Sequence, residues 1–399
     1  MTIDKIYLGT WLPRTHLHLM ELYDFFNDPT HTSNHDKEKL KEFHTKLGII
    51  SVEFQGNPNF NSIKLLTKGI TTTITEDGII LLMVDSIDNI NQNLKNLEEF
   101  FSEKLGPAIA YIFSRGAPLP QTLKHLKEVY PRIFVGKNIT TKDAEEIFHK
   151  RGVSLLTSKS TEDIKIFYGR DIDILSLTSN VKPKDFDDLI ENAVFTNAFL
   201  ELLKRYLHAH REIWEDISTI RLSKNTSYKE FPLIRERILD SLQTISFIKT
   251  RLQQMKDIHS ARNHIISAGI KHKLTELGFE NFKILESSSL YFENLWQMTE
   301  DYANSTLTLF ESLVEENAQR EIRLLQQVTV LGAIVGFFGM NIAFPWEERW
   351  PDVFVSSFVI LVIIVALMGS FYLIIKFTIQ NRRFDISRLE KPQSHLSHL

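Results

Sequence analysis

The spacing of apolar and polar residues changes near residue 180, and the two patterns predict different structures. Before that point, short apolar runs end at Gly, Pro, Asn or Asp, which is typical of strands. The stretches between several of them carry apolar residues at helical spacing. We therefore predict an α/β domain over residues 1–180. The expected strands are 5–11, 48–54, 69–75, 78–84, 108–114, 132–137, 153–158 and 164–170, and the expected helices are 88–105, 120–130 and 141–151.

From about residue 184 the pattern is helical almost throughout. Residues 185–222 and 228–277 predict two long helices. A polar turn at 223–227 separates them, and Gly278 ends the second. We assign residues 181–278 to a region of long helices.

A third helix is predicted to be longer still. Residues 279–331 contain neither glycine nor proline, and apolar or small residues recur at three- and four-residue spacing, which buries one stripe of a helix. An unbroken helix from about 281 to 338 would be about 87 Å long at 1.5 Å per residue. Because so long a helix needs partners along its length, we expect residues 279–323 to form a packed stalk.

Two strongly apolar segments follow, at residues 324–344 and 353–377. Each has about the 20 residues that a helix needs to cross a bilayer. Arginines precede the first segment, and the tail at 378–399 is basic. Because positively charged flanking segments stay in the cytoplasm, both termini should be cytoplasmic and the acidic loop at 345–352 should be external. We predict an integral membrane protein with two spans, in a plasma or inner membrane.

Composition narrows the function without defining it. The chain has 399 residues, 24% of them charged, a net charge of −4 and no cysteine, so disulfides and thiolate metal sites are excluded. The sequence contains no phosphate-binding glycine loop. The histidine pairs 16/18, 208/210 and 395/398 do not have the spacing of metal ligands, so we expect most histidines to lie at the surface. We predict neither an enzyme nor a resident cofactor, and no nucleic-acid partner.

The first apolar segment runs into Gly339-Met340-Asn341, and a short acidic loop and the second apolar segment follow. This order resembles the CorA family of divalent-cation transporters, of the type with two transmembrane helices and a Gly-x-Asn motif. The resemblance implies an α+β fold: an α/β cytoplasmic domain, a very long stalk helix and two transmembrane helices, assembled as a homopentameric funnel in a lipid bilayer. The helix from 281 to 338 would line the pore, and 353–377 would form the outer ring.

By this resemblance, the selectivity filter comprises Gly339, Met340 and Asn341. A ring of Asn341 carbonyl oxygens would accept hydrogen bonds from the water shell of Mg²⁺, which dehydrates reluctantly. Co²⁺ and Ni²⁺ are further expected cargo. Thr329, Gly332, Gly336 and Glu321 are expected to line the pore, and Glu347 and Glu348 to attract cations at its external mouth.

Some positions depart from the family pattern. Where the family commonly has large apolar gate residues and a proline, this chain has Ala318, Glu321, Thr329 and Val330, so a hydrophobic gate is not expected. Glu321 could pair with Arg320 or Arg323 of a neighbouring subunit or bind cations at the pore entrance.

Regulatory cation sites are not assigned by any motif. Asp85, Asp88 and Asp257 are candidates, with surface and helix-cap acids as the plainer interpretation. Two alternatives to a magnesium channel stay open: a transporter of zinc or another divalent cation with the same fold, and a non-conducting, membrane-anchored coiled-coil scaffold or sensor.

Overall fold

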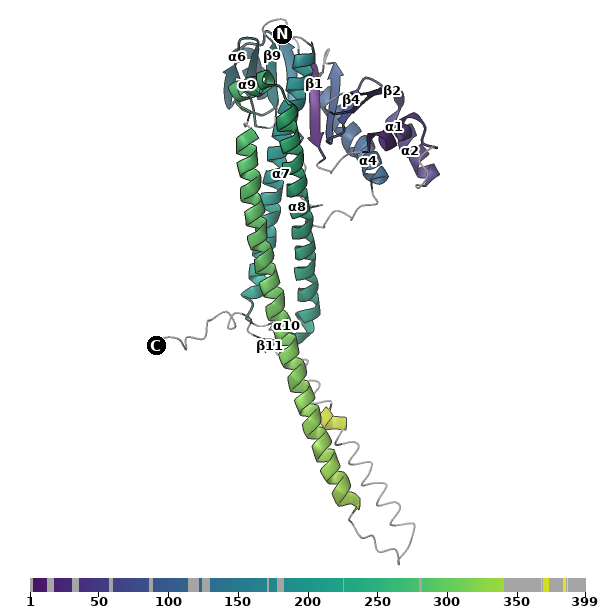
Figure 1. Cartoon of the computed structure of the whole chain (residues 1–399), viewed down its shortest axis with the longest axis vertical. Coiled ribbons are helices and arrows are strands. Elements are labelled where there is room, and N and C mark those ends of the chain that lie inside the picture. Colours follow the sequence, from purple (N-terminus) through teal and green to yellow (C-terminus); the bar gives the residue numbers. More distant parts are fainter. Residues whose placement is uncertain are drawn as a thin grey trace, which may run out of the picture. The chain divides into compact units, whose positions relative to one another are not determined.

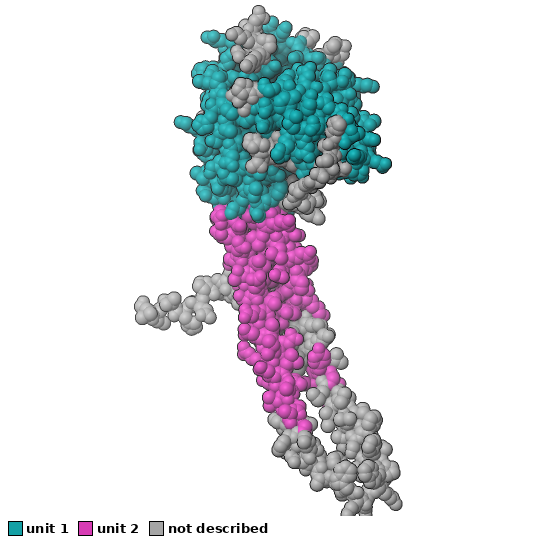
Figure 2. Space-filling model, turned by 45° about the vertical axis from the view of Figure 1, so that its right-hand side comes forward, with its two compact units in different colours: residues 1–210, 246–296 teal, residues 211–245, 297–399 magenta. Residues whose placement is uncertain are grey.

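The protein forms two compact units in a computed structural model, shown in Figure 1. The structure describes residues 3–12, 18–30, 36–56, 60–85, 89–113, 122–123, 130–170, 172–177, 183–224, 226–279, 282–340, 367, 369–372, 383–384 and 386. Unit 1 comprises residues 1–210 and 246–296, and unit 2 comprises residues 211–245 and 297–399 (Figure 2). Three long helices, α7 (Pro183–Arg221), α8 (Phe231–Ile265) and α10 (Phe282–Met340), contribute residues to both units.

Unit 1 is built on a mixed β-sheet in which the described residues form nine strands, in the order β2-β3-β4-β5-β1-β6-β9-β8-β7. Neighbouring strands are antiparallel except for β6 and β9, which are parallel. The bounds are β1 Ile3–Trp11, β2 Ile49–Gln55, β3 Ser62–Thr67, β4 Thr71–Thr75, β5 Ile79–Asp85, β6 Arg132–Lys137, β7 Thr157–Ser160, β8 Ile164–Tyr168 and β9 Asp173–Leu177.

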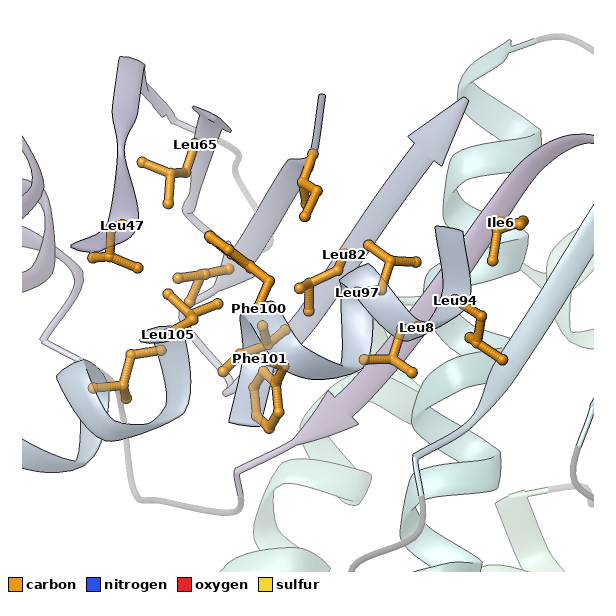
Figure 3. Packing of buried hydrophobic residues seen from close by; sticks show 14 of the residues in the cluster. Ile6, Leu8, Leu47, Leu65, Leu82, Leu94, Leu97, Phe100, Phe101 and Leu105 are labelled. Carbon is orange, nitrogen blue, oxygen red and sulfur yellow. The ribbon is translucent and has the colours of Figure 1, made fainter. Parts of the chain in front are cut away.

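Side-chain alternation along β1 builds a core on each face of this sheet. Ile6 and Leu8 belong to a core that includes residues of α2 (Lys37–Leu47), α3 (Ile90–Glu99) and η1 (Phe100–Leu105) (Figure 3). Helices α1 (Leu19–Asn27), α4 (Gly106–Ile112) and α6 (Thr141–Lys150) contribute further residues to this core. Trp11, of the opposite parity, packs edge-on against Phe195 of α7, with ring centroids 4.8 Å apart. Gly9, on that same face, lies so close to α7 that an added Cβ would be 2.2 Å from Val194 Cγ1.

The mixed α/β character of this region, with a large sheet and long helices, is confirmed, although several expected elements differ. The expected strand at 108–114 is wrong, because residues 106–112 form α4, which begins at Gly106-Pro107 and continues the helical run of α3 and η1. Strands β3 and β9 were not expected. Of the helix expected at 120–130, the structure describes three residues: 122 and 123 are helical, and residue 130 is not.

The second long helix is interrupted, contrary to expectation. Helix α8 ends at Ile265, and Ser267 begins α9 (Ala268–Leu277) by accepting a hydrogen bond from the Ile270 amide at 3.3 Å. A serine favours a helix cap because its hydroxyl satisfies an amide that has no partner inside the helix. Gly278 ends α9 with φ of +90°, as its position in the sequence predicted.

A buried ionic cluster joins the β4–β5 turn to α7 and α8 within unit 1. The Arg262 guanidinium, 2% exposed, donates to Asp77 Oδ2, to Glu191 Oε1 at 2.7 Å and to Asn192 Oδ1 at 3.0 Å. Asp77 is equally buried and accepts a second hydrogen bond from the Thr75 hydroxyl at 2.5 Å. Burial raises the pKa of Glu191, and the charge of Arg262 opposes that rise.

Unit 2 has its own core, formed where α7 ends, α8 begins and α10 passes. Its buried residues are Ile220, Phe231, Ile238, Phe310, Leu313 and Ile386. Stacking of Trp214 on Tyr302, with ring centroids 4.5 Å apart, and an ion pair between Arg237 and Asp216 hold the same helices together. Two short strands, β10 (Thr226–Ser227) and β11 (Arg383–Phe384), pair in antiparallel fashion beside this core.

Candidate functional site

Helix α10 carries most of the predicted site. It is one helix of 59 residues, from Phe282 to Met340, so the unbroken helix expected from sequence is present. Its last residue is the second residue of Gly339-Met340-Asn341. Asn341, Glu347 and Glu348 lie outside the described residues, and their expected roles remain predictions. For Gly339 and Met340 the structure gives the helical backbone.

The burial pattern of α10 changes along its length. Up to Asn317 a buried residue recurs every three or four positions, among them Trp296, Phe310 and Leu313. Beyond that point no residue of known burial is fully buried, and Leu324, Val328 and Gly332 are half-buried. Regular burial on one stripe indicates packing within the chain. Beyond Asn317, the side chains of α10 are therefore packed much less against the rest of the chain.

Large apolar side chains are uncovered in this last part. Ile322 is 54% exposed, Leu325 49% and Val330 59%, and in the second apolar segment Leu367 is 65% exposed, Phe371 48% and Tyr372 55%. Exposed apolar surface of this kind marks contact with other chains or with lipid. In the portion of the chain that the structure describes, no helix is both long and apolar enough to count as a membrane span.

The expected pore-lining residues share one face of α10. At about 100° of rotation per residue, Glu321, Thr329, Gly332 and Gly336 lie within about 80° of one another. Glu321, Thr329 and Gly336 are exposed in the single chain, and Gly332 is half-buried. The Thr329 hydroxyl donates to the Leu325 carbonyl oxygen at 2.9 Å. Because its proton is engaged there, the hydroxyl oxygen offers its lone pairs to any donor outside the helix.

Asn341 cannot be placed on this face by helical period. A regular helix would turn by about two and a half revolutions from Gly332 to residue 341, which corresponds to the opposite side. Since α10 ends at Met340, however, the position of Asn341 is set by the chain beyond the helix. A glycine at 339 gives the backbone the freedom for such a turn.

Charged residues lie immediately before the uncovered part of α10. Arg320 pairs with Glu316 of its own helix, one turn earlier. Glu321 is exposed and forms no ion pair with any described residue. Of the two partners that the sequence suggested for Glu321 on a neighbouring subunit, Arg320 is engaged within the chain and Arg323 is exposed. Pairing with Arg323 and binding of cations both stay predictions for Glu321.

Two of the three candidate regulatory acids lie among the described residues, and neither belongs to a metal site there. Asp85 is the exposed last residue of β5, and Asp257 is exposed on α8, where it accepts a hydrogen bond from Gln253 at 2.9 Å. Asp88 lies outside the described residues. Within the described ranges, no group of three or more His, Asp or Glu side chains could hold a metal ion.

Most of the described histidines are exposed, as expected, but two are buried. His210 lies edge-on to Trp296, with ring centroids 5.5 Å apart, and His259 lies between Phe199 and Phe282. Burial lowers the pKa of His259. His18 and His208 are exposed, while His16, His395 and His398 lie outside the described residues.

Sequence reasoning missed the segment that follows the second apolar region. The sequence predicts only a basic tail there, but Ile386 is fully buried in the core of unit 2, and Phe384 packs against Phe231 with ring centroids 5.1 Å apart. The signal was present in the sequence, since Phe384 and Ile386 alternate within a polar stretch as in a half-buried strand.

Comparison with known proteins gives limited information. No known family model matches the chain, and no curated protein matches it either. One similar solved structure is the complete CorA magnesium transporter from Methanocaldococcus jannaschii, at 13% identity, covering 60% of this chain and 89% of that one, with a TM-score of 0.27. Another is the full-length CmaX protein, at 10% identity, covering 64% and 90%, with a TM-score of 0.29. Identities and TM-scores this low do not establish a common fold or function.

Proposed function

We propose that this chain is the subunit of a CorA-like, homopentameric channel that passes hydrated Mg²⁺, and also Co²⁺ or Ni²⁺, down the electrochemical gradient. The observation that carries the proposal is the unbroken helix α10, which runs from a packed stalk into an apolar segment and ends within Gly339-Met340-Asn341. A helix that only anchored a scaffold would not need glycines and a hydroxyl on one face of that segment.

The return of the chain to its own core supports a membrane hairpin. Leu313 precedes both apolar segments and Ile386 follows both, yet the two residues belong to one buried cluster. If each segment crosses a bilayer, an even number of crossings brings the chain back to the side from which it left. This agrees with the basic residues that flank the two segments on what the charge rule makes the cytoplasmic side.

The chemistry of the shared face suits an ion that keeps its water. Mg²⁺ holds its first-shell waters tightly, and those waters are strong hydrogen-bond donors. Thr329 offers an oxygen whose own proton is already donated, and helical glycines leave room for a hydrated ion. Glu321, at the cytoplasmic end of the face, would concentrate cations by its charge. The driving force is the membrane potential, worth about 2.3 kcal/mol per charge per 100 mV.

The proposal is tested by flux of Mg²⁺ into proteoliposomes that contain the purified protein, with Co²⁺ and Zn²⁺ as competitors. We expect wild-type flux, background flux for Asn341→Ala and unchanged flux for Asn304→Ala, an exposed asparagine on the stalk part of the same helix. Gly336→Leu is a second arm, because among the described residues a Cβ at Gly336 meets nothing within 4 Å beyond the nearby backbone of its own helix. It should therefore leave the subunit folded while it blocks the shared face.

The outcomes separate the alternatives. Preferred flux of Zn²⁺ over Mg²⁺ would change the cargo and keep the channel. An inserted, assembled wild-type protein that conducts no divalent cation would refute the channel and favour the scaffold.

A further inference from the structure

The segment after the second apolar region is fastened to the end of the α7–α8 hairpin. Arg383 and Phe384 pair with Ser227 and Thr226, and the Ile386 amide donates to the Ser223 carbonyl oxygen at 3.1 Å. Ile386 is fully buried among residues of α7, α8 and α10. We name Arg383, Phe384 and Ile386 the C-terminal latch.

Two kinds of contact hold the latch, and both are local. The Phe384 ring packs on Phe231 and, with centroids 6.4 Å apart, on Tyr228. Ile386 belongs to the same buried cluster as Ile220, Phe310 and Leu313. A two-residue ladder has little stability of its own, so these two apolar side chains keep the latch closed.

The turn that receives the latch satisfies much of its own hydrogen bonding. The Ser223 hydroxyl donates to the Ile220 carbonyl oxygen at 2.9 Å and lies 2.6 Å from the Thr226 hydroxyl. Ser227 and Glu230 form a reciprocal capping box at the start of the next helical turn. Opening the latch would therefore cost one strand ladder and two apolar side chains and leave the turn formed. Elements with so few contacts are those that open locally while the rest of a protein stays folded.

We propose that the C-terminal latch is a conformational control of the conducting segment, and that closing it holds α10 in a non-conducting position. This inference rests on the proposed channel function. With the latch closed, the chain beyond the second apolar segment, the α7–α8 turn and α10 at Phe310–Leu313 share one core, so α10 cannot move away from its neighbours there. With the latch open, Phe384 and Ile386 leave that core, and α10 keeps there only its packing against α7 and α8, which restrains its movement less.

A reversible cross-link tests the proposal in the full-length channel. The chain has no cysteine, so Ser227→Cys with Arg383→Cys, which replaces two residues paired across β10 and β11, would place the only two thiols opposite each other. We expect the disulfide to form under mild oxidation, flux to fall several-fold, and a thiol reductant to restore it. Each single cysteine variant is the control, and its flux should respond neither to the same oxidant nor to the reductant.

A release variant tests the opposite direction. Phe384→Ala with Ile386→Ala should raise flux several-fold and speed amide hydrogen exchange in residues 223–231. Leu233→Ala is the matched control, because that side chain lies nearby on α8 but is 61% exposed. It should change neither flux nor exchange.

Each outcome bears on the latch separately from the channel. A disulfide that forms without any change in flux would overturn the proposal, because the latch would then be a fixed contact, and so would failure of the two cysteines to link in the assembled protein. If wild-type protein conducts no divalent cation, the channel and the control of flux both fail. If, in addition, amide hydrogen exchange in residues 223–231 is unchanged in the release variant, the two side chains do not hold the latch closed either.

Discussion

Replacing Arg262 by methionine should destabilise unit 1 strongly and in a pH-dependent manner. Arg262 is the cation between Asp77 and Glu191, and both it and Asp77 are only 2% exposed. Methionine fills much of the same volume and cannot donate a hydrogen bond. The variant therefore leaves two carboxylates and the Asn192 oxygen without the donor they share.

The expected cost follows from what remains buried. Removing one partner of a buried ion pair typically costs about 3–5 kcal/mol, because the other charge stays without compensation. We expect a loss in this range at pH 8. In the wild-type protein burial already raises the pKa of Glu191 while the Arg262 charge lowers it, so loss of Arg262 raises that pKa further. Protonation of Glu191 then relieves the repulsion, by about 1.4 kcal/mol per pH unit below the raised pKa, and the loss should shrink at pH 5.

Amide hydrogen exchange of the full-length protein measures this effect locally. Peptides that cover 71–85 and 255–265 contain the β4–β5 turn and the end of α8, and their free energies of opening should fall in the variant. Lys256→Met is the matched control on the same helix, because Lys256 pairs with Glu293 at 3.4 Å while both side chains are about 40% exposed. Exposed pairs contribute about 0–1 kcal/mol. A loss below about 1 kcal/mol for Arg262→Met, or an equal loss at pH 5 and pH 8, would refute the reasoning.

Two further predictions concern unit 1. Gly9→Ala should lower the thermal midpoint and the free energy of unfolding, the latter by about 1–3 kcal/mol, because the new Cβ would overlap Val194 Cγ1. Adding Val194→Ala should restore the midpoint. Gly269→Ala is the control and should not be destabilising, because a Cβ there meets nothing within 4 Å. Burial raises the pKa of Asp173 to about 7, so its contribution to stability is greatest below about pH 4 and is lost as pH rises through 7. In denaturant unfolding, Asp173→Asn should therefore be more stable than wild type at pH 8, by at most about 4 kcal/mol, and equal to wild type near pH 4. Equal stability of the two proteins at both pH values would argue against the burial effect.

The fold could be predicted from the sequence where one pattern was decisive. Strands such as β1 and β5 are apolar runs between turn residues, and α10 has a long three-four repeat without glycine or proline. The errors occurred where two patterns overlap. The apolar run of α4 fits either a strand or a buried helix. The structure shows that η1 continues directly into α4 at Gly106-Pro107, which makes the run a helix. The break between α8 and α9 depends on a single serine cap, a signal that a long helical pattern easily hides.

The candidate site was predictable to the extent that it lies on one helix. A helical period places Glu321, Thr329, Gly332 and Gly336 on a common face without any knowledge of tertiary structure. The Arg262 cluster could not be found in this way. Its members lie at positions 77, 191, 192 and 262, and only the folding of three distant elements brings them together. The same holds for Ile386, whose burial depends on the core that α7, α8 and α10 form together.

The closure of the chain on itself connects these observations to function. A stretch that leaves a core at Leu313 and returns to it at Ile386 is attached to that core at both ends. Any force that shifts this turn acts on α10 directly, through Phe310 and Leu313, and on the second apolar segment through Phe384 and Ile386. An anchor that only fixed a scaffold to a membrane would work with either attachment alone. In the proposed control of flux, this double attachment is the closed state, and release of Phe384 and Ile386 removes one of the two attachments.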